Sequence, residues 1–151
     1  MLLSRLTRPV RLVRPAARWY CTPPEMPLEA FHCAADGTLQ GIERIIEDYA
    51  DATPTQEIDV ELAGDVLNVG LGARGTFVLN KQSPNQQIWM SSPVSGPLRY
   101  DFCVDTLSWY CRREGKGLLP MVTDDFEALT GERLSFDEVE QEVRDAVKDE
   151  L

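Results

Sequence analysis

The first clear pattern along the chain is helical. From Pro27 to Asp51 the apolar residues recur every three or four positions, so on a helix they share one broad face. Pro27 suits the first turn, and Thr53-Pro54 marks the exit. Gly37 and Gly41 each weaken such a helix by about 1 kcal/mol relative to alanine. We therefore predict a helix over 27–51 whose apolar face consists of Phe31, Ala34, Ile42, Ile45, Ile46 and Tyr49.

Apolar and polar residues then alternate with a period of two. In Glu57–Leu62 the apolar side chains fall on one face and three acids on the other, which is typical of a half-buried strand in an antiparallel sheet. Turn-forming residues, such as Gly64-Asp65 and Ser83-Pro84-Asn85, separate this strand from further short segments. These segments predict strands at Val66–Leu71, Thr76–Lys81, Gln86–Ser91, Leu98–Phe102 and Leu107–Cys111.

Two more helices are expected after the glycine-containing segment 114–117. One spans Leu118–Leu129, with Pro120 in its first turn, and the other spans Phe136–Lys148. Ser135 and Glu138 have the spacing of a capping box at the start of the last helix. A run of hairpins between helices predicts an α+β fold. We expect a two-layer α/β sandwich, with two packed helices on one face of an antiparallel sheet of about five to six strands.

The first twenty residues do not fit this domain. Residues 1–20 contain five arginines, no acid, and leucines and valines spaced between the arginines. This composition is typical of a mitochondrial transit peptide, whereas a secretory signal needs an uninterrupted apolar run. We therefore divide the chain into a transit peptide at 1–20, a domain at 21–131 and an acidic helical tail at 132–151. The amphipathic pattern of the tail suggests that it packs beside the two helices.

Removing that segment makes the net charge of the chain more negative. The whole chain carries 15 basic and 25 acidic residues, a net charge of −10, and without the five arginines the net charge is −15. An acidic field of this size repels nucleic acid and anionic lipid and attracts cations or basic protein surfaces. No apolar run approaches the roughly 18 residues needed to span a bilayer. We therefore expect neither a nucleic-acid nor a membrane partner.

Acidic residues form a stripe on the first predicted helix, opposite its apolar face. Like charges at this spacing repel one another and destabilise the helix. The presence of such a stripe therefore indicates a functional role. Carboxylate oxygens suit hard cations such as magnesium, calcium, manganese and iron ions, and an open surface cluster would bind them weakly. The alternative is a solvated helix face. The stripe consists of Glu29, Asp36, Glu43, Glu47 and Asp51, flanked by Asp48, and Glu57, Asp59 and Glu61 add a second row on the first strand.

A second cluster combines amides with an indole. Asn80, Gln82, Gln87 and Trp89 lie on two predicted strands around a turn and can point to the same sheet face. A tryptophan ringed by adaptable hydrogen-bonding groups is typical of a protein interface. The pattern equally allows Trp89 to pack in the core, with the amides decorating a hairpin.

The chain offers little for enzyme catalysis. His32 is the single histidine, so acid–base chemistry or a two-histidine metal site would be hard to build. Gly70, Gly72 and Gly75 have a dinucleotide-binding spacing but lead into a strand, which indicates a turn. The four cysteines, Cys21, Cys33, Cys103 and Cys111, form no CxxC pair and are expected to be buried or half-buried thiols, with a Cys103–Cys111 pair as the minor alternative.

The stretch Thr76–Asp101, TFVLNKQSPNQQIWMSSPVSGPLRYD, closely resembles the frataxins. The resemblance extends more loosely over Leu28–Leu129. It implies a mitochondrial matrix protein of iron–sulfur cluster biogenesis that docks on the complex of cysteine desulfurase and cluster scaffold and speeds sulfur delivery. It also implies weak iron binding along an acidic ridge. We expect mainly a non-catalytic activator, although the resemblance allows a weak ferroxidase activity, and a ferroxidase or iron-storage protein is the alternative. A monomer is expected, with an iron-driven oligomer as the alternative.

Carried over by position, the resemblance assigns two sets of residues. Gly37, Gln40 and Arg44 stand where relatives often carry acids, so Glu43 and Glu29 are expected to compensate in the ridge. Gln86 replaces a commonly basic residue of the turn. The ridge is Asp36, Glu43, Glu47, Asp48, Asp51, Glu57 and Asp59, and the docking surface is Asn80, Gln82, Asn85, Gln87, Trp89 and Arg99.

Overall fold

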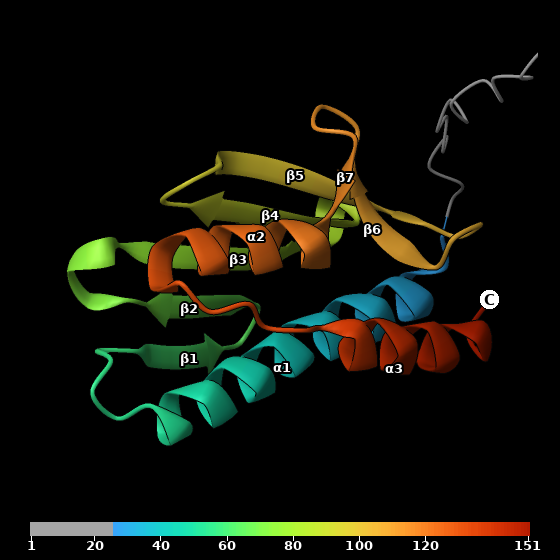
Figure 1. The fold of residues 1–151 in the computed structure, drawn as a ribbon. Helices are drawn as coiled ribbons and strands as arrows, with labels where there is room; N and C mark the ends of the chain where they lie inside the picture. Colours follow the sequence, from blue (N-terminus) through green and yellow to red (C-terminus); the bar gives the residue numbers. More distant parts are fainter. Residues whose placement is uncertain (1–25) are drawn as a thin grey trace, which may run out of the picture.

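The computed structural model describes residues 26–151. The predicted transit peptide and Cys21 lie outside these residues. Within residues 26–151, three helices and seven strands follow one another (Figure 1). The helices are α1 (Leu28–Ala52), α2 (Leu118–Thr130) and α3 (Asp137–Lys148). The strands are β1 (Asp59–Ala63), β2 (Val66–Gly70), β3 (Thr76–Gln82), β4 (Gln87–Ser92), β5 (Gly96–Cys103), β6 (Ser108–Cys111) and β7 (Lys116–Gly117), and the short 3-10 turns η1 (Gly72–Arg74) and η2 (Ser83–Asn85) flank β3.

The sheet is an antiparallel meander. Its strand order is β1-β2-β3-β4-β5-β6-β7, so each strand pairs with its neighbour in the chain. The helices lie on one side of the sheet (Figure 1). This arrangement confirms the predicted two-layer α+β sandwich, with seven strands where about five to six were expected.

The core lies between the sheet and the helices. Aromatic rings link these elements: Tyr49 of α1 meets Phe126 of α2 edge-on, and Phe31 of α1 meets Trp109 of β6 of the sheet in the same way. Trp109 is only 4% exposed, and its indole nitrogen donates to Thr38 Oγ1 on α1 at 2.9 Å. Among residues 26–151, no helix covers the opposite face of the sheet (Figure 1).

The last helix packs along the first. The valines Val139 and Val143 of α3 are buried against α1, where Gly41 and Gly37 leave room for them. A Cβ atom at Gly41 would lie 2.5 Å from Val139 Cγ1, so the two helices approach too closely for a larger residue. The expectation that the tail packs beside the helices is confirmed for α1, because α3 lies alongside the first part of α1 (Figure 1).

Two local predictions were wrong. The capping box does not form, because Ser135 Oγ bonds with Asp137 while Glu138 turns toward Arg44, and α3 begins at Asp137. No strand was predicted in the segment 114–117, but Lys116–Gly117 forms β7 and pairs with β6. No helix among residues 26–151 combines the length and the apolar character needed to cross a membrane.

Candidate functional site

The predicted docking residues line up across the outer face of the sheet. In the strand register Asn80 lies beside Trp89, and Trp89 lies beside Arg99. One step further along the strands, Gln82 lies beside Gln87. The outer face follows from alternation, because every second residue of β3, β4 and β5 is buried toward the helices. The buried residues are Phe77, Leu79, Ile88, Met90, Leu98 and Tyr100.

Trp89 is the centre of a connected network on this face. Its Nε1 donates to Gln87 Oε1 at 2.9 Å, and Gln87 Nε2 donates to Asp101 Oδ1 at 2.8 Å. Arg112 Nε lies 3.4 Å from the other carboxylate oxygen of Asp101. On the ring itself, Arg99 Cζ stands 4.4 Å from the ring centroid, within cation–π range. The indole is therefore held in place and half-buried, with its ring at the surface and not in the core.

A hollow of about 720 Å³ covers this part of the sheet. Four predicted docking residues line it, namely Asn80, Gln87, Trp89 and Arg99. Sequence reasoning missed Asp101, Arg112 and Arg113, which also line it. Asp101 stood within the quoted motif, but only the strand register shows that it faces the same way as Gln87. We call Asn80, Gln82, Gln87, Trp89 and Arg99 the docking face.

Two residues of the turn before β4 differ in role, since one is exposed and the other holds the fold. Asn85 in η2 is exposed beside the docking face. Gln86 takes a left-handed backbone conformation, and its Nε2 donates to the Met26 carbonyl oxygen at 2.8 Å. Gln86 therefore ties the turn to the segment that leads into α1.

Two predicted ridge residues have partners within the protein. Asp36 accepts a hydrogen bond from Lys81 Nζ at 2.7 Å, and the same ammonium lies 2.8 Å from Asp65. Burial of Lys81 acts against its charge, but the two carboxylates outweigh this effect and raise its pKa. Glu43 Oε1 accepts a hydrogen bond from the backbone N–H of Leu62 at 3.2 Å. These two acids link α1 to the sheet, so their oxygens are less available to a metal ion.

The other five predicted ridge residues are exposed. Glu47, Asp48 and Asp51 lie in the last two turns of α1, where the last turn has no basic residue. Glu57 lies over Gly72, whose missing side chain leaves room for it, and Asp59 opens β1. We call these five residues the acidic band. Across residues 26–151, no three Asp, Glu, His or Cys side chains lie together as a ready-made metal site.

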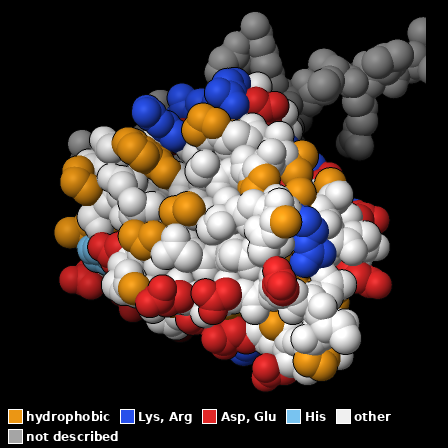
Figure 2. Space-filling view, turned by 90° about the vertical axis from the view of Figure 1, so that its left-hand side faces the viewer, with side chains coloured by type: hydrophobic (Ala, Val, Ile, Leu, Met, Phe, Trp, Pro, Cys, Tyr) orange, Lys and Arg blue, Asp and Glu red, His pale blue; other side chains and the backbone are white. Residues whose placement is uncertain are grey.

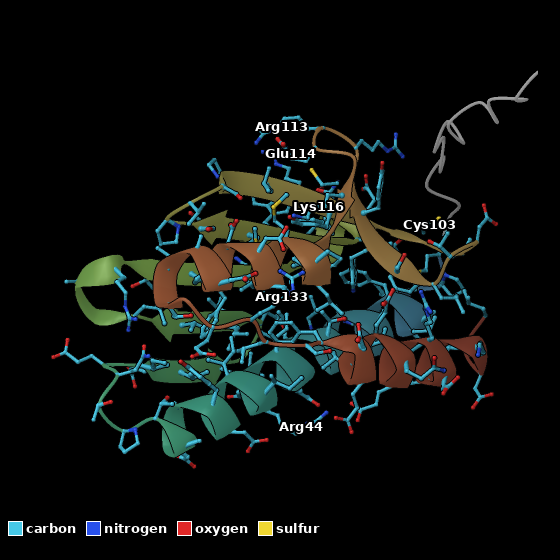
Figure 3. All side chains as sticks on the ribbon, viewed as in Figure 1. Arg44, Cys103, Arg113, Glu114, Lys116 and Arg133 are labelled. Atoms are coloured by element: carbon cyan, nitrogen blue, oxygen red, sulfur yellow. The ribbon has the colours of Figure 1, made fainter. Side chains whose placement is uncertain are left out.

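Charges of opposite sign are separated on the surface (Figure 2). In this view acidic side chains gather over the lower half, where α1 and β1 lie, and basic side chains gather mainly at the upper edge. Arg113 belongs to that upper edge, at the β6–β7 turn, where its Nε donates to Glu114 at 2.8 Å (Figure 3). Such a surface suits a partner that carries both signs of charge.

The helix α3 contacts α1 at two positions, Gly37 and Arg44, where the predicted ridge lacks acids. Arg44 on α1 lies 3.0 Å from Glu142 and 3.7 Å from Glu138, both on α3 (Figure 3). The missing side chains of Gly37 and Gly41 leave room on α1 for the valines of the same helix. Arg44, Gly37 and Gly41 of α1 thus all contact α3.

The described cysteines form no disulfide. These cysteines are Cys33, Cys103 and Cys111, and Cys103 lies opposite Ser108 rather than Cys111 in the strand register. Burial, with Glu150 and Asp36 nearby, raises the pKa of Cys33 above its usual value. The expectation of buried or half-buried thiols is confirmed for these three residues, and the alternative pair is absent.

Comparisons with known proteins agree with this fold. A family model for a frataxin-like domain matches residues 24–132. The mitochondrial frataxin of Arabidopsis thaliana is 44% identical over 108 residues, which cover 72% of this chain and 58% of the relative. The mitochondrial frataxin of Caenorhabditis elegans is 39% identical over 109 residues, covering 70% of this chain and 79% of the relative.

Solved structures give the same result. Yeast frataxin is 38% identical, with a TM-score of 0.61 over 70% of this chain and 84% of that chain. A trimeric frataxin from Saccharomyces cerevisiae, complexed with ferrous iron, is 36% identical, with a TM-score of 0.58 over 66% of this chain and 87% of that chain. The resemblance drawn from Thr76–Asp101 is thus confirmed over most of the domain. The chain therefore belongs to the frataxin family, among the mitochondrial frataxins.

Proposed function

We propose that this chain is an iron-binding regulator of iron–sulfur cluster assembly in the mitochondrial matrix. In this proposal it docks on the complex of cysteine desulfurase and cluster scaffold and accelerates the delivery of sulfur and iron. The observation that carries the proposal is Trp89, an indole held at the surface of an uncovered sheet face. An apolar ring at the surface is poorly hydrated and adds nothing to the core, so its position suits a protein interface.

The docking face is prepared for binding before a partner arrives. The Trp89 N–H is already bonded to Gln87, and Arg99 stacks on the ring, so little side-chain freedom is left to lose. A partner conformation that offers an apolar surface to the ring gains more from this face than one that does not. Regulation then follows from differential binding, because the chain shifts the complex toward the conformation that it binds better.

The acidic band supplies the proposed iron site. Carboxylate oxygens are suitable ligands for iron ions, and five of these acids are exposed. They have no enclosing shell and no preformed arrangement, so binding is expected to be weak and exchangeable. A relative complexed with ferrous iron supports the choice of metal. Weak binding of this kind suits a carrier or sensor of iron better than a permanent centre.

Replacing Trp89 tests the docking mechanism. We expect Trp89→Ala, and separately Asn80→Ala, to abolish stimulation of cluster assembly by the purified desulfurase and scaffold, because the indole contact or its neighbouring amide is lost. Val94→Ala, at an exposed apolar residue outside this face, is the matched control and should stimulate as wild type does. Circular dichroism and urea unfolding should show that all three variants are folded. If Trp89→Ala stimulated assembly as well as wild type, the mechanism would be wrong.

A second candidate function is iron oxidation or storage. It is favoured by the relatives from Saccharomyces cerevisiae that crystallised as trimers, one of them complexed with ferrous iron. Neutralising Glu47, Asp48 and Asp51 together separates the two functions. Loss of iron binding with stimulation retained supports the regulator, whereas loss of both, with iron-driven trimers in the wild type, supports the iron-centred function.

A further inference from the structure

Three arginines lie together at one side of the docking face. Arg99, Arg112 and Arg113 all line the hollow over the sheet, and all three are exposed. In the strand register Asp101 lies beside Tyr110. Two residues further along each chain segment, the same antiparallel register brings Arg99 next to Arg112. We call Arg99, Arg112 and Arg113 the arginine edge.

Arg99 has no counterion among the described residues. Its guanidinium stands over the Trp89 ring, and it takes part in no hydrogen bond or ion pair within residues 26–151. Every other lysine or arginine in this part of the chain has such a partner. The whole chain has 25 acidic residues against 15 basic ones, so an arginine without a carboxylate partner is unexpected. The Arg99 guanidinium can therefore bind an anionic group from outside the protein.

The contacts of the other two arginines are exposed and exchangeable. Arg112 pairs with Asp101, and Arg113 Nε donates to Glu114, its neighbour in the chain, at 2.8 Å. Arg113 Nη2 also donates to the Pro97 carbonyl oxygen at 3.3 Å. The side chains of Arg112 and Arg113 are 52% and 65% exposed. Ion pairs at this exposure contribute little to stability, so a carboxylate of a partner can share or replace them at small cost.

The hollow is positively charged, although the chain is acidic. Three arginines and one acid, Asp101, line it, which gives a net charge of +2, whereas the whole chain has a net charge of −10. Most acidic side chains in Figure 2 lie over the lower half of the molecule, away from the basic upper edge. Surface charges are screened over about 8 Å at physiological ionic strength, so the nearest charges decide what the hollow attracts.

We propose that the arginine edge binds the carboxylates of an acidic segment in the protein that the docking face recognises. This inference rests on the proposed function and adds the chemistry of the partner segment. The segment places an apolar side chain on the Trp89 ring and carboxylates beside Arg99 and Arg113. Asn80, which lines the same hollow, offers an amide to its backbone. A nucleic acid fits less well, because its continuous row of phosphates also meets Asp101 and the acidic field of the chain.

Two peptides test this chemistry on the full-length chain. Acetyl-Glu-Glu-Leu-Glu-Glu-amide offers carboxylates and an apolar side chain, and the same peptide with glutamine in place of each glutamate lacks the charge. The readout is the NMR signal of the Trp89 indole N–H, since Trp89 lines the hollow. We expect a saturable shift with the glutamate peptide at roughly tenfold lower concentration than with the glutamine peptide, and this difference should shrink as salt is added.

Paired variants assign the effect to the arginine edge. Arg112→Gln combined with Arg113→Gln should weaken binding of the glutamate peptide roughly tenfold, as the loss of two exposed ion pairs provides. Arg133→Gln combined with Lys148→Gln removes the same charge at exposed positions outside the hollow and is the control. It should bind the peptide as wild type does. Circular dichroism should show that both double variants are folded.

The same variants separate this inference from the proposed function. When wild type stimulates cluster assembly, Arg112→Gln with Arg113→Gln should need roughly tenfold more protein for half-maximal stimulation but reach the same maximum, because Trp89 is intact. If wild type gives no stimulation, the proposed function fails, while the peptide titration still tests the arginine edge.

Several results would overturn the inference. These are equal binding of the two peptides, no saturable shift with the glutamate peptide, or an arginine variant that behaves as the control does. A ten-nucleotide deoxythymidine strand that binds more tightly than the glutamate peptide would identify a nucleic acid as the occupant. Sedimentation at low salt covers the remaining rival, because self-association of wild type but not of the arginine variant would make a second copy of this chain the occupant.

Discussion

Two tryptophans show what a single residue can and cannot reveal in the sequence. Trp89 and Trp109 both lie in strands, yet the first faces the open side of the sheet and bonds with Gln87, while the second is buried against α1. Alternation predicts that neighbours point to opposite faces, but it does not say which face the helices cover. The alternation alone therefore left the position of Trp89 undecided, and the tertiary structure places its ring on the open face.

Tyr100 is a residue at which stability and pH are linked. Its hydroxyl is buried without a partner, and burial, with Cys111 and Asp125 nearby, raises its pKa well above the usual value near 10. An unfolded chain loses this proton near pH 10, whereas the folded chain keeps it to higher pH. Stability is thus intact below pH 10 and falls as the pH rises beyond it.

We expect Tyr100→Phe to lessen that alkaline loss. At pH 7 the variant should be as stable as wild type or up to about 1 kcal/mol more stable, because an unsatisfied buried hydroxyl is removed. Urea unfolding at pH 7 and at pH 10.5 measures both effects. A fall with pH as steep as in wild type would contradict this account, while a share of the fall remains in both proteins because Lys81 also has a raised pKa.

At the scale of elements, a strong periodicity of apolar residues was enough to predict a helix or strand, whereas a short segment without such a pattern was not. All three predicted helices and all six predicted strands lie within two residues of their observed ends, since their apolar faces repeat over whole elements. The strand β7 was missed because two residues beside glycine carry no pattern. The seat for α3 was missed because Gly37 and Gly41 were interpreted only as helix-weakening residues, whereas their lack of a side chain admits Val143 and Val139.

The two glycines should respond to alanine with opposite signs. Gly41→Ala places a Cβ atom at 2.5 Å from Val139 Cγ1 and should destabilise the protein by about 1–3 kcal/mol. Gly37→Ala meets Val143 at 3.4 Å and should stabilise it by up to about 1 kcal/mol through helix propensity. Chemical unfolding measures both, and combining Gly41→Ala with Val139→Ala should recover part of the loss. An equal effect at both glycines would argue against the close approach of α3.

Over the whole molecule, charge and stability oppose each other at the acidic band. Asp48 and Asp51 lie near the end of α1, where the helix dipole disfavours negative charge and the last turn has no basic residue. The sequence predicted that acids gather on this side, but it did not reveal that Lys81 would neutralise Asp36 or that Glu43 would hold β1. Those contacts join residues far apart in the chain.

Asp48→Asn combined with Asp51→Asn should therefore stabilise the protein while weakening iron binding. We expect a gain of a few tenths of a kcal/mol per site, which decreases as salt is added. Thermal unfolding at low and high ionic strength gives the stability, and titration with ferrous iron under nitrogen gives the binding. Asp105→Asn, an exposed acid between β5 and β6, serves as the control for charge alone. Unchanged iron affinity in the double variant would remove these two acids from the proposed site.

The sequential order of the strands bears on how the protein reaches its folded form after import. A chain that enters an organelle through a narrow channel emerges unfolded and in order. In this sheet each newly emerged strand can pair with the one that precedes it, so no early strand has to wait for a distant partner. The helix α2 then packs onto α1 and the sheet, and α3 comes last and binds back onto α1, where its valines complete the hydrophobic core.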